Sequence, residues 1–149
     1  MLTCRAAEMT GDGQGISLSV MLIVPDARAA VEWYRTALGA TELWDLGSVA
    51  GLQLEGAPFF LHESVAGRAN ERSPIDAGLT TTRIEVFLDD PGRLIDRAAA
   101  AGATRVEHLT PHEAPWGIHR QGGFTDPFGH RWSVGDRTPL QPTRRDLRR

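Results

Sequence analysis

The stretch Val24-Pro25-Asp26 … Leu38-Gly39-Ala40-Thr41 decides the fold, because the chain repeats it as Leu88-Asp89-Asp90 … Ala101-Gly102-Ala103-Thr104. Asp89 follows Asp26 by 63 residues, and Gly102 follows Gly39 by the same interval. Apolar positions coincide when the copies are aligned, for example Val31 with Leu94. Self-similarity at a fixed offset indicates two similar folded units. We therefore predict a duplicated module.

The bulk properties of the chain predict one domain. A chain of 149 residues with 41% hydrophobic content is long enough to bury a single core. A net charge of −3 provides no general attraction for nucleic acid or acidic membranes. The lone Cys4 excludes an internal disulfide and is typical of a reducing cytoplasm. We expect a flexible lead-in (1–15), one domain (16–140) and a basic tail (141–149) in a cytoplasmic protein.

Each predicted module is a strand, a capped helix and three short strands. In module 16–64, the strand is 17–24, the helix runs from the N-cap Asp26 to Gly39, and strands follow at 41–46, 49–54 and 59–62. In module 80–140, the strand is 82–88, the helix runs from Asp89-Asp90-Pro91 to Gly102, and strands follow at 104–109, 117–124 and 131–134. The segment 64–79 is predicted to be a linker or mobile loop.

Two motifs resemble the vicinal oxygen chelate superfamily of glyoxalase I, bleomycin-resistance proteins and extradiol dioxygenases. The run from Ala29 to Ala40, with Trp33-Tyr34 before the terminal Gly39-Ala40, is similar to its first-helix signature. Asp126-Pro127-Phe128-Gly129-His130-Arg131-Trp132, preceded by Trp116-Gly117 … Arg120, is similar to the closing signature of the PhnB-like branch. Here Ile118-His119 separates Gly117 from Arg120, which departs from the branch's usual spacing.

The resemblance implies an α+β fold in which two tandem βαβββ modules form curved mixed sheets around a cavity. The two halves of that cavity come from one chain or from two, and a homodimer is expected. Strand alternation then assigns the faces. Val20, Leu22 and Val24 should pack under the helix, whereas Arg83 and Glu85 should face the cavity with Phe87.

The resemblance also implies where a metal would be held, and the residues at those positions are unsuitable. The positions fall on Ser19, on Arg83 (or Thr82, one residue earlier) and on Ser133. A guanidinium cannot coordinate a metal, and serine hydroxyls are poor ligands for Zn, Ni or Fe. No cofactor and no metal site is therefore predicted, while a divalent metal held by other ligands stays open.

The histidines provide weak alternatives to that metal site. Pro111 lies between His108 and His112 and prevents one helical face from presenting both rings, so both are expected on a connecting loop. His62 either reaches the rim of the cavity or is an ordinary residue at a strand end. His130 is expected to form hydrogen bonds within its own turn.

Arg83 and Glu85 are the most informative pair without a metal, because residues two apart on a strand share a face. Arg83 could bind an anionic or carbonyl-bearing ligand while Glu85, the candidate catalytic residue, orients it or moves a proton. The alternative is an ion pair at a dimer seam. Trp116, Arg120 and Trp44 are candidate ligand contacts at the cavity, with core or interface packing as the alternative for the tryptophans.

Two functions are compatible with these residues. The first is a glyoxalase/bleomycin-resistance-like protein that binds a small organic molecule in a cavity without the superfamily's metal. The second is an enzyme on the same fold, of the lyase, isomerase or dioxygenase class, that uses Glu85 or an unrecognised metal set. Expected partners are a small-molecule ligand and a second copy of the chain, but neither nucleic acid nor a membrane.

Overall fold

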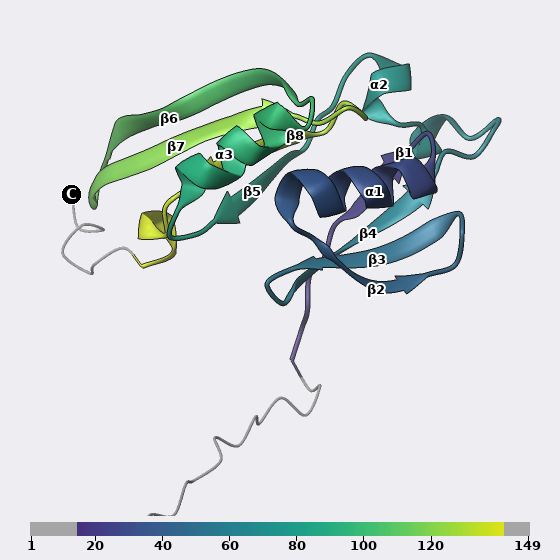
Figure 1. Ribbon diagram of the computed structural model, residues 1–149, viewed down its shortest axis with the longest axis horizontal. Coiled ribbons are helices and arrows are strands. Elements are labelled where there is room, and N and C mark those ends of the chain that lie inside the picture. The colour runs from purple at the N-terminus through teal and green to yellow at the C-terminus, as the bar shows by residue number, and fades with distance from the viewer. Residues whose placement is uncertain (1–14, 142–149) are drawn as a thin grey trace, which may run out of the picture.

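The computed structural model describes residues 15–141 and contains two modules with the same order of elements (Figure 1). The first consists of β1 (Met21–Val24), α1 (Ala27–Leu38), β2 (Thr41–Asp45), β3 (Val49–Leu54) and β4 (Ala57–Glu63). The second consists of β5 (Arg83–Phe87), α3 (Pro91–Ala100), β6 (Thr104–Ala114), β7 (Gly117–Thr125) and β8 (Arg131–Gly135). The predicted βαβββ tandem is confirmed. Apart from Gly15 and Gln141, the predicted lead-in and tail lie outside the described residues.

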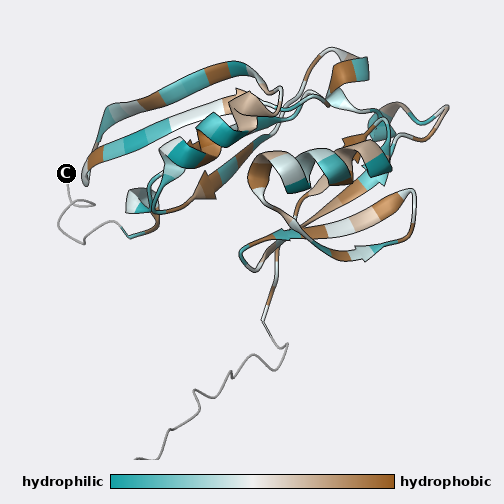
Figure 2. Cartoon of the chain, viewed as in Figure 1, coloured by the Kyte–Doolittle hydropathy of each residue, from teal (hydrophilic) through white to brown (hydrophobic). Residues whose placement is uncertain are grey.

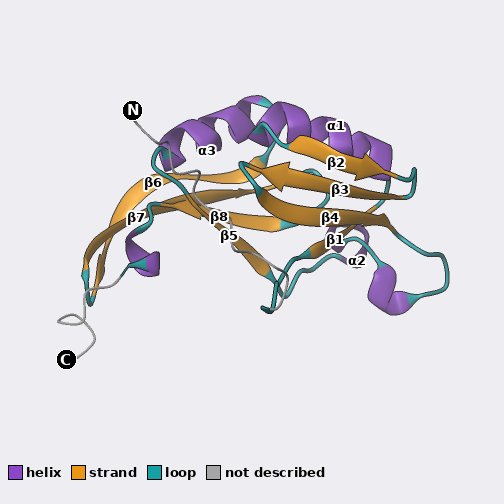
Figure 3. Ribbon diagram, turned by 90° about the horizontal axis from the view of Figure 1, so that it is seen from below, coloured by secondary structure: helices purple, strands orange, loops and turns teal. Residues whose placement is uncertain are grey.

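Each module forms one four-stranded mixed sheet. The strand orders are β1-β4-β3-β2 and β5-β8-β7-β6. The first strand of each module pairs in parallel with the last, and the other pairs are antiparallel. The long helices α1 and α3 lie on the same side of the two sheets, and neither covers the opposite side (Figure 3).

The helix ends follow from local chemistry. The Asp26 carboxylate accepts a hydrogen bond from the backbone N–H of Ala29 at 3.0 Å, and Gly39 ends α1 with a left-handed φ of 70°. In α3 the Asp90 carboxylate accepts from the backbone N–H of Arg93 at 3.2 Å, and the C-cap is Ala101, one residue before the predicted Gly102. The apolar residues of each helix pack on its sheet, and Figure 2 shows brown apolar segments among teal polar ones along both helices.

Two segments differ from the prediction. The segment 64–79 contains a 3-10 turn, η1 (Ala69–Glu71), and a short helix, α2 (Pro74–Ala77). Strand β6 continues to Ala114, so His108 and His112 lie on a strand rather than on a connecting loop. The error arose because Pro111 suggested a break, whereas β6 is the edge strand of its sheet, where proline is tolerated.

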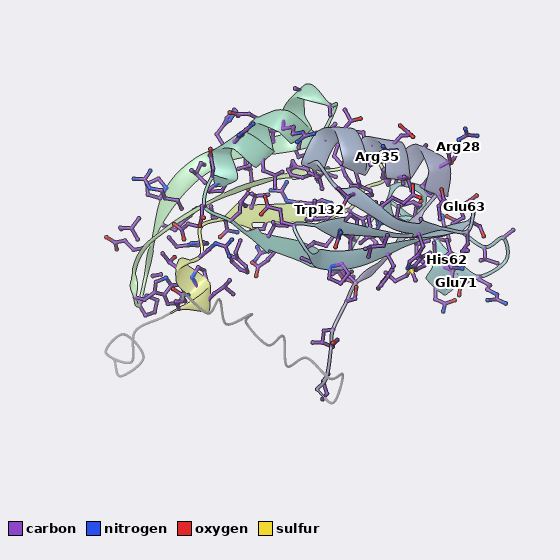
Figure 4. All side chains as sticks on the ribbon, turned by 60° about the horizontal axis from the view of Figure 1, so that its bottom comes forward. Arg28, Arg35, His62, Glu63, Glu71 and Trp132 are labelled. Carbon is purple, nitrogen blue, oxygen red and sulfur yellow. The ribbon has the colours of Figure 1, made fainter. Side chains whose placement is uncertain are left out.

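One buried carboxylate joins the two modules. Asp126 is 2% exposed, and its Oδ1 accepts from the backbone N–H groups of Phe128 and His130, both at 2.9 Å. Its Oδ2 accepts from the Tyr34 hydroxyl at 2.5 Å and from the Trp132 indole N–H at 2.9 Å. Tyr34 belongs to α1 and Trp132 to β8, and Figure 4 shows Trp132 in the interior. We call these three side chains the Asp126 cluster.

Further contacts join the modules around this cluster. The His130 Nε2–H donates to the carbonyl of Ile23 in β1 at 2.8 Å. His130 was predicted to form hydrogen bonds within its own turn, but its side chain bonds to the first module. The Trp33 indole N–H donates to the Ala101 carbonyl, also at 2.8 Å. The Arg97 guanidinium donates to the Thr36 carbonyl at 2.8 Å. The two halves therefore share one core.

The linker packs on the same turn. The Ile75 backbone N–H donates to the Phe128 carbonyl at 2.9 Å. Gly129 has a φ of +91°, and a Cβ atom there would lie 2.6 Å from the Ile75 nitrogen. The turn therefore requires glycine both for its backbone conformation and for the close approach of the linker.

No helix in the described part of the chain is long and apolar enough to span a bilayer.

The Asp126 cluster predicts an alkaline loss of stability that depends on Tyr34. Burial and the Asp126 carboxylate raise the pKa of the Tyr34 hydroxyl well above its ordinary value of 10.0. Its contribution is complete below pH 10 and is lost as pH rises above 10, because the unfolded chain then ionises first. Tyr34→Phe should lower the free energy of unfolding by about 1–3 kcal/mol at pH 8 and flatten its decline above pH 10. Urea unfolding between pH 8 and 11 measures both effects.

The composition makes that titration easy to assign. The chain has one tyrosine and no lysine, so apart from Cys4 no other side chain titrates near pH 10. The assignment would be contradicted if the free energy of unfolding of Tyr34→Phe declined above pH 10 as steeply as that of the wild type.

Candidate functional site

The site is built on the faces of the two sheets that lie opposite the helices, here called the open faces. In β1, Leu22 and Val24 are buried under α1, whereas the neighbouring Met21 is 48% exposed. In β5, Arg83 and Glu85 are exposed, whereas Ile84 and Val86 pack against the core. The predicted assignment of faces is confirmed in both strands.

The open face of the first sheet carries an aromatic platform formed by Trp44, Phe60 and Met21. Pairing aligns these residues across the sheet in the order Met21, Phe60, Gly51, Trp44. The Trp44 and Phe60 rings stack with centroids 5.7 Å apart and planes 24° apart. Trp44 reaches Phe60 by lying over Gly51, where a Cβ atom would be 2.7 Å from the indole ring. Trp44 keeps 38% of its surface exposed.

The open face of the second sheet is polar and its charges are paired. Arg83 and Glu85 form an ion pair at 2.8 Å, with side chains 57% and 44% exposed. Arg131, on the neighbouring strand, forms a second pair with Glu107 at 2.8 Å. Such exposed pairs contribute about 0–1 kcal/mol each to stability. The two guanidinium groups of these pairs are therefore balanced by their two carboxylates.

The same face holds a hydrogen-bonded group that sequence reasoning missed. His119 is 8% exposed, and its Nδ1 lies 2.7 Å from Asp136 Oδ1 and 3.1 Å from Thr138 Oγ1. The Gln121 side-chain amide donates to the Ser133 hydroxyl nearby. In the sequence, His119 and Asp136 stand on either side of β8, which is the one signal that could have indicated this contact. Only the pairing of β7 with β8 brings the two side chains together.

Asp136 is ionised at neutral pH because of its hydrogen bonds. Burial raises the pKa of this carboxyl, but donors from Thr138, Arg120 and His119 outweigh burial and lower its pKa well below the ordinary 3.8. The backbone N–H of Arg120 donates at 2.8 Å and the Thr138 hydroxyl at 2.6 Å. The carboxylate therefore holds both the His119 ring and the segment that follows β8.

The other predicted site residues are dispersed. Ser19 is exposed and donates to the Pro58 carbonyl at 3.2 Å. Half-buried His62 donates from Nδ1 to the Glu63 carbonyl at 2.6 Å, at the end of β4 (Figure 4). Trp116 lies in the turn between β6 and β7, with its indole N–H buried and without a partner among the described residues.

Arg120 lies on the side of β7 that faces α3. It alternates with Gly122, where a Cβ atom would be 2.7 Å from the Ile95 side chain of α3, and with the buried Phe124. Its guanidinium is thus separated from Arg83 and Glu85 by the sheet. A hollow of about 770 Å³ also lies on the helix side, lined by Arg97, Glu32 and Glu42 among others, and it does not overlap the open faces.

The residues present do not fit the metal that the fold family implies. Arg83 occupies one ligand position as a paired guanidinium, and Ser133 occupies another as a hydroxyl bonded to Gln121. Among residues 15–141, no three His, Cys, Asp or Glu side chains are grouped so that they could hold a metal ion.

Comparison with known proteins establishes the family. The model of the Glyoxalase/Bleomycin resistance protein/Dioxygenase superfamily matches residues 16–134. The chain therefore belongs to that superfamily. An uncharacterized protein of Mycobacterium tuberculosis (strain CDC 1551 / Oshkosh) is 34% identical over 143 residues, which cover 88% of this chain and 82% of that protein.

Solved structures share the fold at lower identity. TioX from Micromonospora sp. ML1 is 24% identical with a TM-score of 0.63, covering 82% of this chain and 98% of that one. The fosfomycin resistance protein FosX from Listeria monocytogenes, complexed with Mn(II) and sulfate, is 17% identical with a TM-score of 0.59, covering 83% and 90%. At these identities the likeness shows the fold alone.

The depressed pKa of Asp136 predicts an acid-dependent contribution to stability. This contribution is complete above the ordinary value of 3.8 and is lost as pH falls below it, because the unfolded chain binds the proton first. Asp136→Asn should therefore flatten the decline in the free energy of unfolding below pH 4, as measured by urea denaturation between pH 2 and 6.

A matched control is Asp89→Asn. Asp89 pairs with Arg137 through a carboxylate that is 91% exposed, so its loss should change stability by less than about 1 kcal/mol. If the free energy of unfolding declined equally below pH 4 in wild type and Asp136→Asn, the role given to the Asp136 hydrogen bonds would be wrong.

Proposed function

We propose that the protein binds a small organic molecule through a planar apolar part seated on the aromatic platform. The observation that carries this proposal is the Trp44–Phe60 stack, which is held flat over Gly51 and still 38% exposed at Trp44. A partly exposed, oriented indole gives a ligand ring a large contact area and a defined stacking geometry. A core tryptophan such as Trp132, which is 1% exposed, cannot act in this way.

The polar part of the ligand is uncharged or zwitterionic. Both guanidinium groups on the open face of the second sheet already have carboxylate partners at 2.8 Å. A simple anion would have to displace Glu85 or Glu107 before it could pair with Arg83 or Arg131. A molecule with both a donor and an acceptor can instead join these pairs without leaving a charge unpaired.

A second copy of the chain closes the site. Small-molecule sites bury most of their ligand's surface, whereas the platform of a single chain is open to solvent at Met21 and Trp44. A two-fold arrangement can place the aromatic sheet of one copy over the polar sheet of the other, because each surface occurs once per chain. The ligand then contacts apolar and polar surfaces together.

The motif from Asp126 to Trp132 favours the PhnB-like branch of the superfamily.

Binding without a metal is the form of the function that the donor set supports. The superfamily's ligand positions hold a paired arginine and a bonded serine. The FosX protein of Listeria monocytogenes was solved with Mn(II), and the side chains of this chain differ from those that a divalent metal requires.

Binding is tested with a panel of planar aromatic compounds grouped as neutral, zwitterionic or anionic, screened by thermal shift and titrated by calorimetry. Neutral and zwitterionic members should bind more tightly than anionic ones. Trp44→Ala should weaken binding roughly 2- to 10-fold, as expected for the loss of one aromatic pair. Leu46→Ala removes an apolar side chain that is 76% exposed and outside the platform, so it should have no effect. Equal losses in both variants, or binding by none of the panel, would refute the proposal.

Closure by a second copy is tested by light scattering coupled to size-exclusion chromatography. The expected mass is twice the chain's 16.3 kDa at micromolar concentration. A chain that stays at 16.3 kDa with saturating ligand would contradict closure, while leaving stacking on Trp44 to be judged by the titrations.

A further inference from the structure

The Nδ1 nitrogen of the His119 ring is held by hydrogen bonds. Nδ1 lies within hydrogen-bond distance of Asp136 Oδ1 and Thr138 Oγ1. The Asp136 carboxylate has no hydrogen to donate, and the Thr138 hydroxyl donates its own hydrogen to Asp136 at 2.6 Å. Nδ1 must therefore carry the hydrogen. In the neutral ring, the free lone pair is consequently on Nε2.

The Nε2 edge of the ring lies on the open face of the second sheet. A Cβ atom built on Gly135 would be 2.8 Å from His119 Cε1 and 3.1 Å from Nε2. Gly135 follows Val134, which is 0% exposed in the core, so its missing side chain would point to the open face. Gly135 pairs with Gln121, which holds Ser133 on the same face. Among the described residues, no hydrogen bond occupies Nε2.

We propose that His119 is a general base for a ligand bound over this face and that Asp136 is its positioning residue. This proposal rests on the proposed small-molecule site and adds a reaction to it. The substrate class is an organic molecule with a weakly acidic C–H or O–H group. The proton passes from that group to Nε2 and the electron pair of the broken bond stays on the ligand. The imidazolium then returns the proton to the same atom or to a neighbouring one, so no co-reactant is consumed.

His119 suits this role better than Glu85. The Glu85 carboxylate is 44% exposed and pairs with Arg83 at 2.8 Å, so a proton transferred to it would disrupt that ion pair. His119 is shielded, and the ionised Asp136 stabilises the imidazolium that proton transfer creates, which is the arrangement of a base with an orienting carboxylate.

The ring's state is tested without any ligand. Nitrogen-edited NMR of the wild-type protein should show His119 with its hydrogen on Nδ1. Diethyl pyrocarbonate, which attacks a free imidazole nitrogen, should modify His119 much faster than His130, with the sites located by mass spectrometry. His130 is a matched control, since it is equally exposed at 8% but its Nε2 donates to the Ile23 carbonyl. A hydrogen on Nε2, or modification as slow as that of His130, would overturn the proposal.

Proton transfer is tested with 5-nitrobenzisoxazole, a planar carbon acid whose ring opens to a coloured phenolate when a base removes its C–H proton. The wild-type protein should open it at least roughly tenfold faster than buffer, within the range of general-base catalysis. His119→Asn keeps an amide that can donate to Asp136 but lacks Nε2, so the acceleration should be lost. His112→Asn removes the exposed imidazole paired with His119 across β6 and β7 and should keep it.

The outcomes separate this proposal from the binding proposal. Equal rates for wild type and His119→Asn, with the aromatic panel still dependent on Trp44, would leave a binding protein without this base. A His119-dependent rate that is unaffected by Trp44→Ala would support the base and count against the platform.

Discussion

The Asp126 carboxylate is the constraint on which the rest of the structure depends. A buried carboxylate is strongly unfavourable unless its oxygens are hydrogen-bonded, and here each oxygen has two donors. Two donors are backbone groups of the turn itself, one is Trp132 of the second module, and one is Tyr34 of the first. This single group therefore ties the turn to both modules.

Much of the fold could be predicted because it depends on short-range periodicity. The helix caps and the strand faces are visible within windows of a few residues, and the duplication is visible as the same local pattern repeated 63 residues later. The stack of Trp44 on Phe60 was not, because it requires Gly51 to pair with both residues. His119 was missed for the same reason: its partner Asp136 is 17 residues away, and their contact depends on the register of β7 against β8. Pro111 misled because edge strands tolerate what inner strands do not.

The two open faces divide the chemistry of the protein between them. One presents apolar rings and the other presents paired charges together with a histidine. The superfamily's fold is retained, while arginine and serine stand where a metal would need ligands. On the function we propose, the ligand is selected by stacking on the first face and by hydrogen bonding to the second, and the proposed reaction is a proton transfer to His119. Sites of different chemistry on one scaffold are expected, because fold does not determine function.

Because the two modules share one core, cleavage of the backbone between them need not separate them. The exposed residues 66–68 lie between β4 and η1, away from the hydrogen bonds of the Asp126 cluster. A cut there would leave two fragments, one with Tyr34 and one with Asp126, each exposing apolar surface shaped for the other. Neither piece contains the whole core, because the core cluster draws its buried residues from both. Mixed together, the fragments should reassemble, so this single chain behaves physically as a heterodimer whose subunits are tethered.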